Sequence, residues 1–147
     1  MKKALLRMTG ILALAFMAAP QIARAQDPLL VNIPFEFTAG RMALPAGEYR
    51  VEKWTTDSVT LLIQRTDLSA GTFVQSNPTV ANAKQMQSKL VFHRYGNRYF
   101  LSQVWVAGSS RGRELPKSAR EKEQALAARN ESQDEVTILA LLVPQKR

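Results

Sequence analysis

Apolar and polar residues alternate through positions 31–37 of this chain. The apolar positions are Val31, Ile33, Phe35 and Phe37. A period of two residues is typical of a β-strand that buries one face. Pro34 falls on the polar side of the alternation and has no N–H to donate to a neighbouring strand. We therefore expect this strand at a sheet edge, or interrupted by a bulge.

The residues that follow contain two turn signals, Gly40 and the segment Leu44-Pro45-Ala46-Gly47. Glycine tolerates positive φ and proline fixes φ near the value that turns need, so the chain is expected to reverse here. Residues 49–54 and 59–64 alternate again, which predicts a three-stranded meander whose inward positions are Tyr49, Val51, Val59, Leu61 and Ile63. A further short strand is predicted at residues 72–75.

A β-hairpin is predicted from residues 89–95 and 98–106. Gly96-Asn97 lies between these two apolar runs and is a two-residue connection of the kind that hairpin turns favour. Both residues tolerate positive φ, which such turns require. Residues 79–88 mix good helix formers with strand-like neighbours, and we interpret them as irregular.

The last third of the chain predicts one helix and one strand. Ser118 and Glu121 have the spacing of a capping box, which predicts a helix over about residues 118–129. Residues 136–143 are apolar at nearly every position, which indicates a central strand buried on both faces. The whole pattern predicts a mainly β fold, a small antiparallel β-sandwich or partly closed barrel of about seven strands, with one C-terminal helix before the last strand.

Residues 1–25 have the three-part pattern of a secretory signal peptide. Basic residues come first, an apolar run over residues 10–19 follows, and Ala23-Arg24-Ala25 supplies small residues for a signal peptidase. The apolar run is about half as long as the roughly 20 residues of a membrane-spanning helix, so cleavage between Ala25 and Gln26 is favoured over an uncleaved anchor. The mature chain is then exported to the periplasm or beyond, without a transmembrane segment, and residues 26–147 suffice for one domain.

Removing the signal peptide changes the charge of the chain. The net charge of +8 includes four cations of residues 1–25, and without them 16 basic and 12 acidic residues leave +4. This value is ordinary for a soluble domain, and with export it argues against nucleic acid as a partner. The sequence has no cysteine, which excludes disulfide bonds and a lipid-modified N-terminal cysteine.

Few residues offer catalytic or metal chemistry. His93 is the only histidine, so metal sites with two histidines are excluded, and no nucleophile stands beside it in the sequence. A carboxylate pair acting on a glycoside could come from Glu36, Glu48, Glu52 or Asp57. The simpler interpretation is that these charges keep an exposed sheet face soluble. We therefore expect no catalytic residues, no cofactor and no metal site, and a protein that is not an enzyme.

Two groups of residues are candidates for ligand binding. The first gathers cations and aromatic rings at the tip of the predicted hairpin, where they could hold a sugar or an anionic group, and comprises His93, Arg94, Tyr95, Arg98 and Tyr99. A solvated turn whose rings pack inward is the favoured alternative. The second group, Arg111 and Arg113 with Lys117 and Arg120, precedes or opens the predicted helix, where cations oppose the helix dipole. An anionic partner would explain that placement, and so would neutralisation by neighbouring glutamates.

Three segments carry a resemblance to a known group of proteins. Asn32-Ile33-Pro34-Phe35-Glu36-Phe37, Leu44-Pro45-Ala46-Gly47-Glu48-Tyr49 and Gly112-Arg113-Glu114-Leu115-Pro116 resemble segments of small secreted bacterial β-rich proteins of uncharacterised function. The resemblance covers most of the mature chain. It implies export and a β fold, and it brings no activity, ligand or catalytic residue.

The sequence thus leads to three functional hypotheses. The leading one is a non-enzymatic β module with a binding or structural role at the cell envelope, its partner a glycan, an anionic envelope component or another envelope protein. The second is a carrier of a small apolar or lipid-like ligand, with Trp54, Tyr99 and Trp105 at the mouth of a barrel. The third, a glycan-active enzyme, lacks a catalytic motif.

Overall fold

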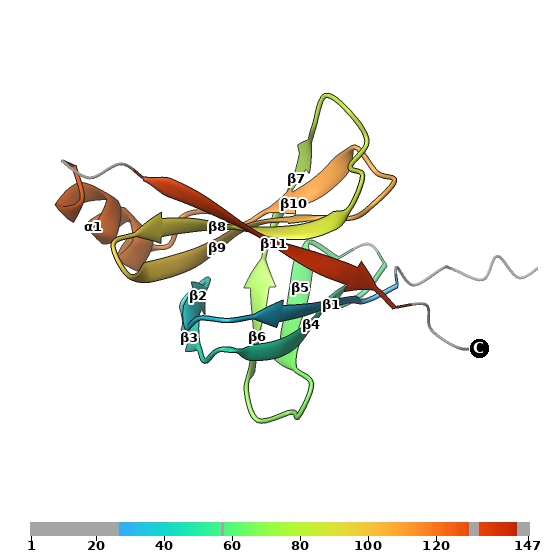
Figure 1. Ribbon diagram of the computed structural model, residues 1–147, viewed down its shortest axis with the longest axis horizontal. Coiled ribbons are helices and arrows are strands. Elements are labelled where there is room, and N and C mark those ends of the chain that lie inside the picture. The colour runs from blue at the N-terminus through green and yellow to red at the C-terminus, as the bar shows by residue number, and fades with distance from the viewer. Residues whose placement is uncertain (1–26, 57, 130–132, 144–147) are drawn as a thin grey trace, which may run out of the picture.

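The computed structural model describes residues 27–56, 58–129 and 133–143 (Figure 1). The predicted signal peptide, its cleavage point at Ala25 and Gln26, and Asp57 lie outside the described residues. Within them the chain forms eleven strands and one helix, in the order β1 Leu29–Ile33, β2 Phe37–Ala39, β3 Met42–Leu44, β4 Gly47–Lys53, β5 Thr60–Arg65, β6 Gly71–Gln75, β7 Asn77–Val80, β8 Ser88–Tyr95, β9 Arg98–Trp105, β10 Arg111–Glu114, α1 Ala119–Ala127 and β11 Asp134–Leu142.

The strands form one nearly closed, barrel-like sheet. Their order is β3-β2-β9-β8-β11-β1-β4-β5-β6, with β10 pairing to both β7 and β9. Neighbours are antiparallel, except that β2 runs parallel to β9. In Figure 1, β8, β9 and β10 lie above β1, β4 and β5, and β11 crosses between the two groups. The mainly β class and the single helix are confirmed.

The strand count is eleven rather than about seven, and proline explains one of the differences. The single strand predicted over residues 31–37 is split into β1 and β2, because Pro34 has no N–H and the ladder to β4 ends at Ile33. Phe37 then begins the pairing with β9. The other additions, β3, β7 and β10, are three or four residues long, too short to show a periodic pattern.

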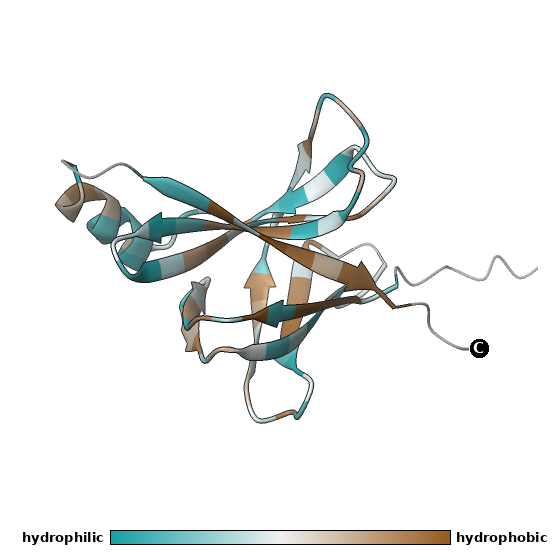
Figure 2. Cartoon of the chain, in the orientation of Figure 1, coloured by the Kyte–Doolittle hydropathy of each residue, from teal (hydrophilic) through white to brown (hydrophobic). Residues whose placement is uncertain are grey.

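The core lies inside the curved sheet and is formed by the inward-facing side chains of most strands. Tyr49, Val51, Leu61 and Ile63 are buried as the alternation predicted. Val59 is exposed, because β5 begins one residue later and leaves Val59 in the preceding turn. Figure 2 shows hydrophobic colour along much of β1, β5 and the later part of β11, while α1 carries both hydrophilic and hydrophobic colour.

The strand β11 has the predicted central position but not the predicted burial. It pairs with β8 on one side and with β1 on the other. Val136, Ile138 and Ala140 face the core, whereas Leu139 and Leu141 are 58% and 70% exposed. The prediction of burial on both faces was wrong, because the outer face of this part of the sheet is open to solvent.

The helix α1 starts where the capping pattern predicted. Ser118 is the N-cap, and its side-chain oxygen accepts a hydrogen bond of 3.2 Å from the backbone N–H of Glu121. The helix ends at Ala127, two residues before the predicted end. In the described part of the chain, no helix is long and apolar enough to cross a membrane.

Candidate functional site

A buried polar cluster joins α1 to the outer face of the β8–β9 hairpin. Glu121 is 4% exposed, and its Oε1 lies 2.7 Å from Nδ1 of His93. The hydroxyl of Tyr95 donates to the same oxygen over 3.2 Å. His93 and Tyr95 are two residues apart on β8 and so project from the same face of the strand. Tyr95 also packs edge-on against Phe100 of β9.

A β-bulge places α1 over this face. Phe92 pairs with Leu101 and Val91 with Gln103, so Ser102 is the additional residue of β9. The carbonyl of Ser102 accepts a 2.7 Å hydrogen bond from the backbone N–H of Leu115, which directs the chain toward the cap of α1. The first turn of the helix is thereby held over β8.

The cluster raises the pKa of Tyr95 to about 12, first because burial disfavours the phenolate and second because of the negative charge of Glu121. Among the described residues no hydroxyl or thiol hydrogen-bonds to His93, so this imidazole has no nucleophile to activate. What the arrangement does is fix the helix to the sheet. The cap formed by Ser118 and Glu121 and the lone histidine His93 are visible in the sequence, but the contact between His93 and Glu121 is not.

A polar cavity of about 330 Å³ lies on the other side of the hairpin tip. Asn97, Arg98 and Tyr99 form one wall, and Glu36 and Thr38 form another because β2 runs alongside β9. Arg120 reaches the cavity from the first turn of α1. Within the described residues, neither Arg98 nor Arg120 has a carboxylate at ion-pair distance. We call this space the hairpin-tip cavity.

The predicted hairpin-tip group is thus divided between two faces. His93 and Tyr95 face α1, whereas Arg98 and Tyr99 line the hairpin-tip cavity. The ring of Tyr99 stacks on Phe35 with 3.8 Å between ring centroids, and the guanidinium of Arg94 lies 5.7 Å from its centre. Tyr99 is therefore already engaged by two protein groups, and its ring is not free to stack on a sugar.

The other predicted cations, Arg111 and Arg113, lie on β10 beside a second cavity of about 340 Å³. Core side chains form its floor, namely Leu29, Val51, Leu61, Val104 and Val106. The Nη2 of Arg113 donates to the carbonyl of Ser58 over 3.1 Å, which ties β10 to the β4–β5 connection. We call this space the inter-sheet cavity.

Two of the candidate acid–base carboxylates, Glu36 and Glu52, lie in different cavities. Glu36 lines the hairpin-tip cavity, whereas Glu52 lines the inter-sheet cavity and forms a 3.4 Å ion pair with Arg50. In the part of the chain that the structure describes, no group of three histidine, aspartate or glutamate side chains could hold a metal ion.

The aromatic residues predicted for a barrel mouth are also separated. Trp54 is exposed and contacts Phe73 edge-on, with ring centroids 4.9 Å apart. Trp105 is buried, and its indole packs against Gly112. With Tyr99 held on Phe35, these three rings do not surround one opening.

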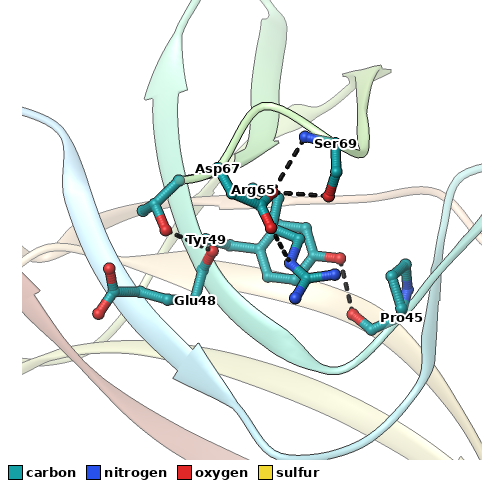
Figure 3. Close-up of polar contacts among 7 residues, drawn as sticks. Pro45, Glu48, Tyr49, Arg65, Asp67 and Ser69 are labelled. Carbon is teal, nitrogen blue, oxygen red and sulfur yellow. Dashed lines mark hydrogen bonds and ion pairs between the residues drawn. The ribbon is translucent and has the colours of Figure 1, made fainter.

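The segment Leu44–Tyr49, part of the resemblance noted above, forms a structural corner (Figure 3). The hydroxyl of Tyr49 donates to the carbonyl of Pro45 over 2.6 Å, and burial raises the pKa of Tyr49. The guanidinium of Arg65 lies against Gly47, where a β-carbon would come 2.8 Å from Nε. Arg65 is in turn paired with Asp67 at 3.3 Å. These contacts account for the segment by folding alone.

Comparison with protein-family models, curated proteins and solved structures found no match to this chain. Of the cavities above, the hairpin-tip cavity brings together two exposed arginines, Arg98 and Arg120, that form no ion pair within the described residues.

Proposed function

We propose that this protein is an exported, non-enzymatic β module that binds an acidic glycan of the cell envelope in the hairpin-tip cavity. The observation that carries the proposal is the convergence of Arg98 and Arg120 on one cavity, where no carboxylate of the described residues pairs with either. Guanidinium groups bind carboxylates through paired hydrogen bonds. The cavity volume of about 330 Å³ falls within the range of small-molecule sites.

The remaining lining residues favour an acidic sugar over a phosphate. Asn97 and Thr38 can exchange hydrogen bonds with sugar hydroxyls, and the carboxylate of Glu36 can accept from them. The negative charge of Glu36 would oppose a doubly charged phosphate more strongly than a singly charged uronic acid. A polar, hydroxyl-rich ligand with one negative charge per unit satisfies all of these groups.

Calorimetric titration of the mature chain, residues 26–147, with glucuronic acid oligomers tests this proposal. Binding is expected for these oligomers and not for neutral glucose oligomers of the same length. Arg98→Ala should weaken binding by roughly tenfold or more, the range for hydrogen bonds to charged groups. Lys122→Ala, an exposed cation of α1 that does not line the cavity, is the matched control and should bind as the wild type does. Equal binding of Arg98→Ala and wild type would refute the proposal.

The same samples test the non-enzymatic part of the proposal. We expect no new reducing ends from the oligomers after prolonged incubation. Hydrolysis that disappears in Glu36→Gln would instead make the cavity a catalytic site.

Export is tested by the N-terminus of the protein recovered from cells. The proposal predicts that it begins at Gln26 and is found outside the cytoplasm. A full-length chain that stays in the cytoplasm would contradict export and would leave the cavity without access to the envelope.

The inter-sheet cavity favours a second candidate function, the carriage of a small amphipathic ligand. Its floor is apolar, and Arg111 and Arg113 stand beside it, an arrangement that suits a short acyl chain with an acidic head. Native mass spectrometry after mild extraction should then show a bound small molecule that Val104→Trp excludes by filling the floor. Recovery of the bare chain mass alone would reject the carrier function.

A further inference from the structure

The sheet does not close. Its main strand order ends at β3 and at β6, and β7, which among the described residues pairs only with β10, is a further edge. Within the described residues β3 pairs only with β2, and β6 pairs only with β5. The edges at β3 and β6 come close at one end, where a β-carbon on Gly40 would lie 3.2 Å from the side chain of Val74. Figure 1 shows the β2–β3 hairpin beside β6.

The register shows which backbone groups of β6 face away from β5. The N–H of Ser76 donates to Val59, and the N–H of Arg65 donates to the carbonyl of Ala70. In an antiparallel pair the hydrogen-bonded positions alternate, so Val74 and Thr72 bond to β5. The N–H and C=O groups of Phe73 and Gln75 therefore point outward, where the Thr72 hydroxyl reaches the Phe73 carbonyl over 3.4 Å.

A groove of about 860 Å³ runs along this free edge. Four consecutive residues of β6, Thr72–Gln75, line it on one side, and Gly40, Arg41 and Met42 line it on another. The chain from Leu115 to Arg120 forms the remaining wall. Met42 and Phe73 are 50% and 55% exposed there, so the groove offers apolar contacts beside main-chain groups that do not pair with β5.

The charged side chains described in the groove lining are all positive. Arg41, Lys117 and Arg120 line the groove, and the described residues of its lining include no aspartate or glutamate. Among the described residues none of these cations is in an ion pair. Three uncompensated cations beside a free strand edge favour a negatively charged occupant.

We propose that an extended acidic peptide of a partner protein binds in this groove as an additional strand on β6. Strand addition supplies main-chain hydrogen bonds to Phe73 and Gln75, and acidic side chains of the peptide meet the groove cations. A second copy of this chain fits poorly, because two identical basic grooves would repel and residues 71–75 contain no acidic side chain. The proposal is independent of glycan binding, and Arg120, which lines both sites, is left out of its test.

The probe is a capped octapeptide of alternating valine and glutamate, with binding measured by fluorescence anisotropy. Two further versions carry N-methyl groups, one on the valine amides and the other on the glutamate amides. Only alternate amides of an added strand face its neighbour. One N-methylated version should therefore lose roughly tenfold or more of the affinity while the other binds like the parent. Equal binding of both would mean that charge alone holds the peptide, and would overturn the proposal.

Variants of the protein test the same contact from the other side. Gln75→Pro removes an outward N–H and leaves the ladder to β5 intact, so the chain should fold and lose most of its peptide binding. Gln75→Val keeps the N–H and should bind as the wild type does.

The charges of the groove are tested separately. Lys117→Ala should weaken binding roughly two- to fivefold, as expected for an exposed ion pair, and a peptide with lysine in place of glutamate should not bind. Arg98→Ala should not change peptide binding, which separates this site from the hairpin-tip cavity.

Two outcomes would count against the proposal. One is undiminished binding to a Gln75→Pro variant whose circular dichroism spectrum matches the wild type. The other is a concentration-dependent dimer in sedimentation that Gln75→Pro abolishes, because the occupant of the edge would then be a second copy of this chain.

Discussion

Raising the pH should remove the stability that Tyr95 gives to the fold. Burial and the charge of Glu121 raise the pKa of Tyr95 from near 10 to about 12. Between these two values the native state keeps a proton that the unfolded state has lost, so unfolding releases a proton and is favoured by rising pH. The contribution is fully present below about pH 10 and is lost as the pH approaches about 12.

The size of the effect follows from the shift. Two pKa units correspond to about 2.7 kcal/mol over the whole window, and about half of this is lost by about pH 11. Tyr95→Phe removes the hydroxyl that donates to Glu121 over 3.2 Å, which should cost roughly 1–2 kcal/mol at about pH 8. By about pH 11 the wild type should no longer be more stable than Tyr95→Phe. At that pH Tyr95 ionises when the wild type unfolds, and this ionisation favours unfolding.

Urea denaturation followed by far-ultraviolet circular dichroism measures the two free energies of unfolding. Lysines and other titrating groups are common to the wild type and Tyr95→Phe. Their effect on stability therefore cancels in the difference between the two free energies of unfolding. Absorbance of the tyrosinate ion gives an independent measure, because Tyr95→Phe should remove the step that titrates near pH 12. A difference in stability that stays constant from about pH 8 to about pH 11 would refute the proposed burial of Tyr95 against Glu121.

Substitutions at three further positions test the packing that holds the fold together. Gly112→Ala would place a β-carbon 2.5 Å from the buried Trp105 ring and should cost roughly 1–3 kcal/mol of stability in urea denaturation. Ser118→Ala removes the acceptor for the Glu121 N–H and should cost about 1 kcal/mol, whereas Ser118→Asp should keep the wild-type midpoint. Tyr49→Phe removes a 2.6 Å hydrogen bond at the β3–β4 corner and should lower the free energy of unfolding by about 1 kcal/mol.

Local patterns in the sequence predicted the longer elements well. The Gly96-Asn97 turn joins β8 to β9, and the alternation over Tyr49–Trp54 marks the buried face of β4. The outer face of β11 was predicted wrongly, because apolar residues do not say whether another layer covers them. Burial there depends on where α1 packs, which is a property of the whole fold.

The candidate sites depend more heavily on contacts distant in sequence. Arg98, Arg120 and Glu36 lie in separate segments of the sequence. The parallel pairing of β2 with β9 brings Glu36 and Arg98 to one cavity, and the position of α1 adds Arg120. The contact between His93 and Glu121 likewise requires the bulge at Ser102 and the cap of α1. No spacing within one segment could have revealed either arrangement.

The position of β11 has a consequence for how the chain is made. Residues 134–142 are the common neighbour of β8 and β1, and Leu29 pairs with Leu142 from nearly opposite ends of the described chain. Until β11 leaves the ribosome, β1 and β8 each present an unpaired edge that can associate with other chains. Strong expression should therefore favour aggregation of nascent chains, and a chaperone that holds them unfolded should improve the yield of folded protein.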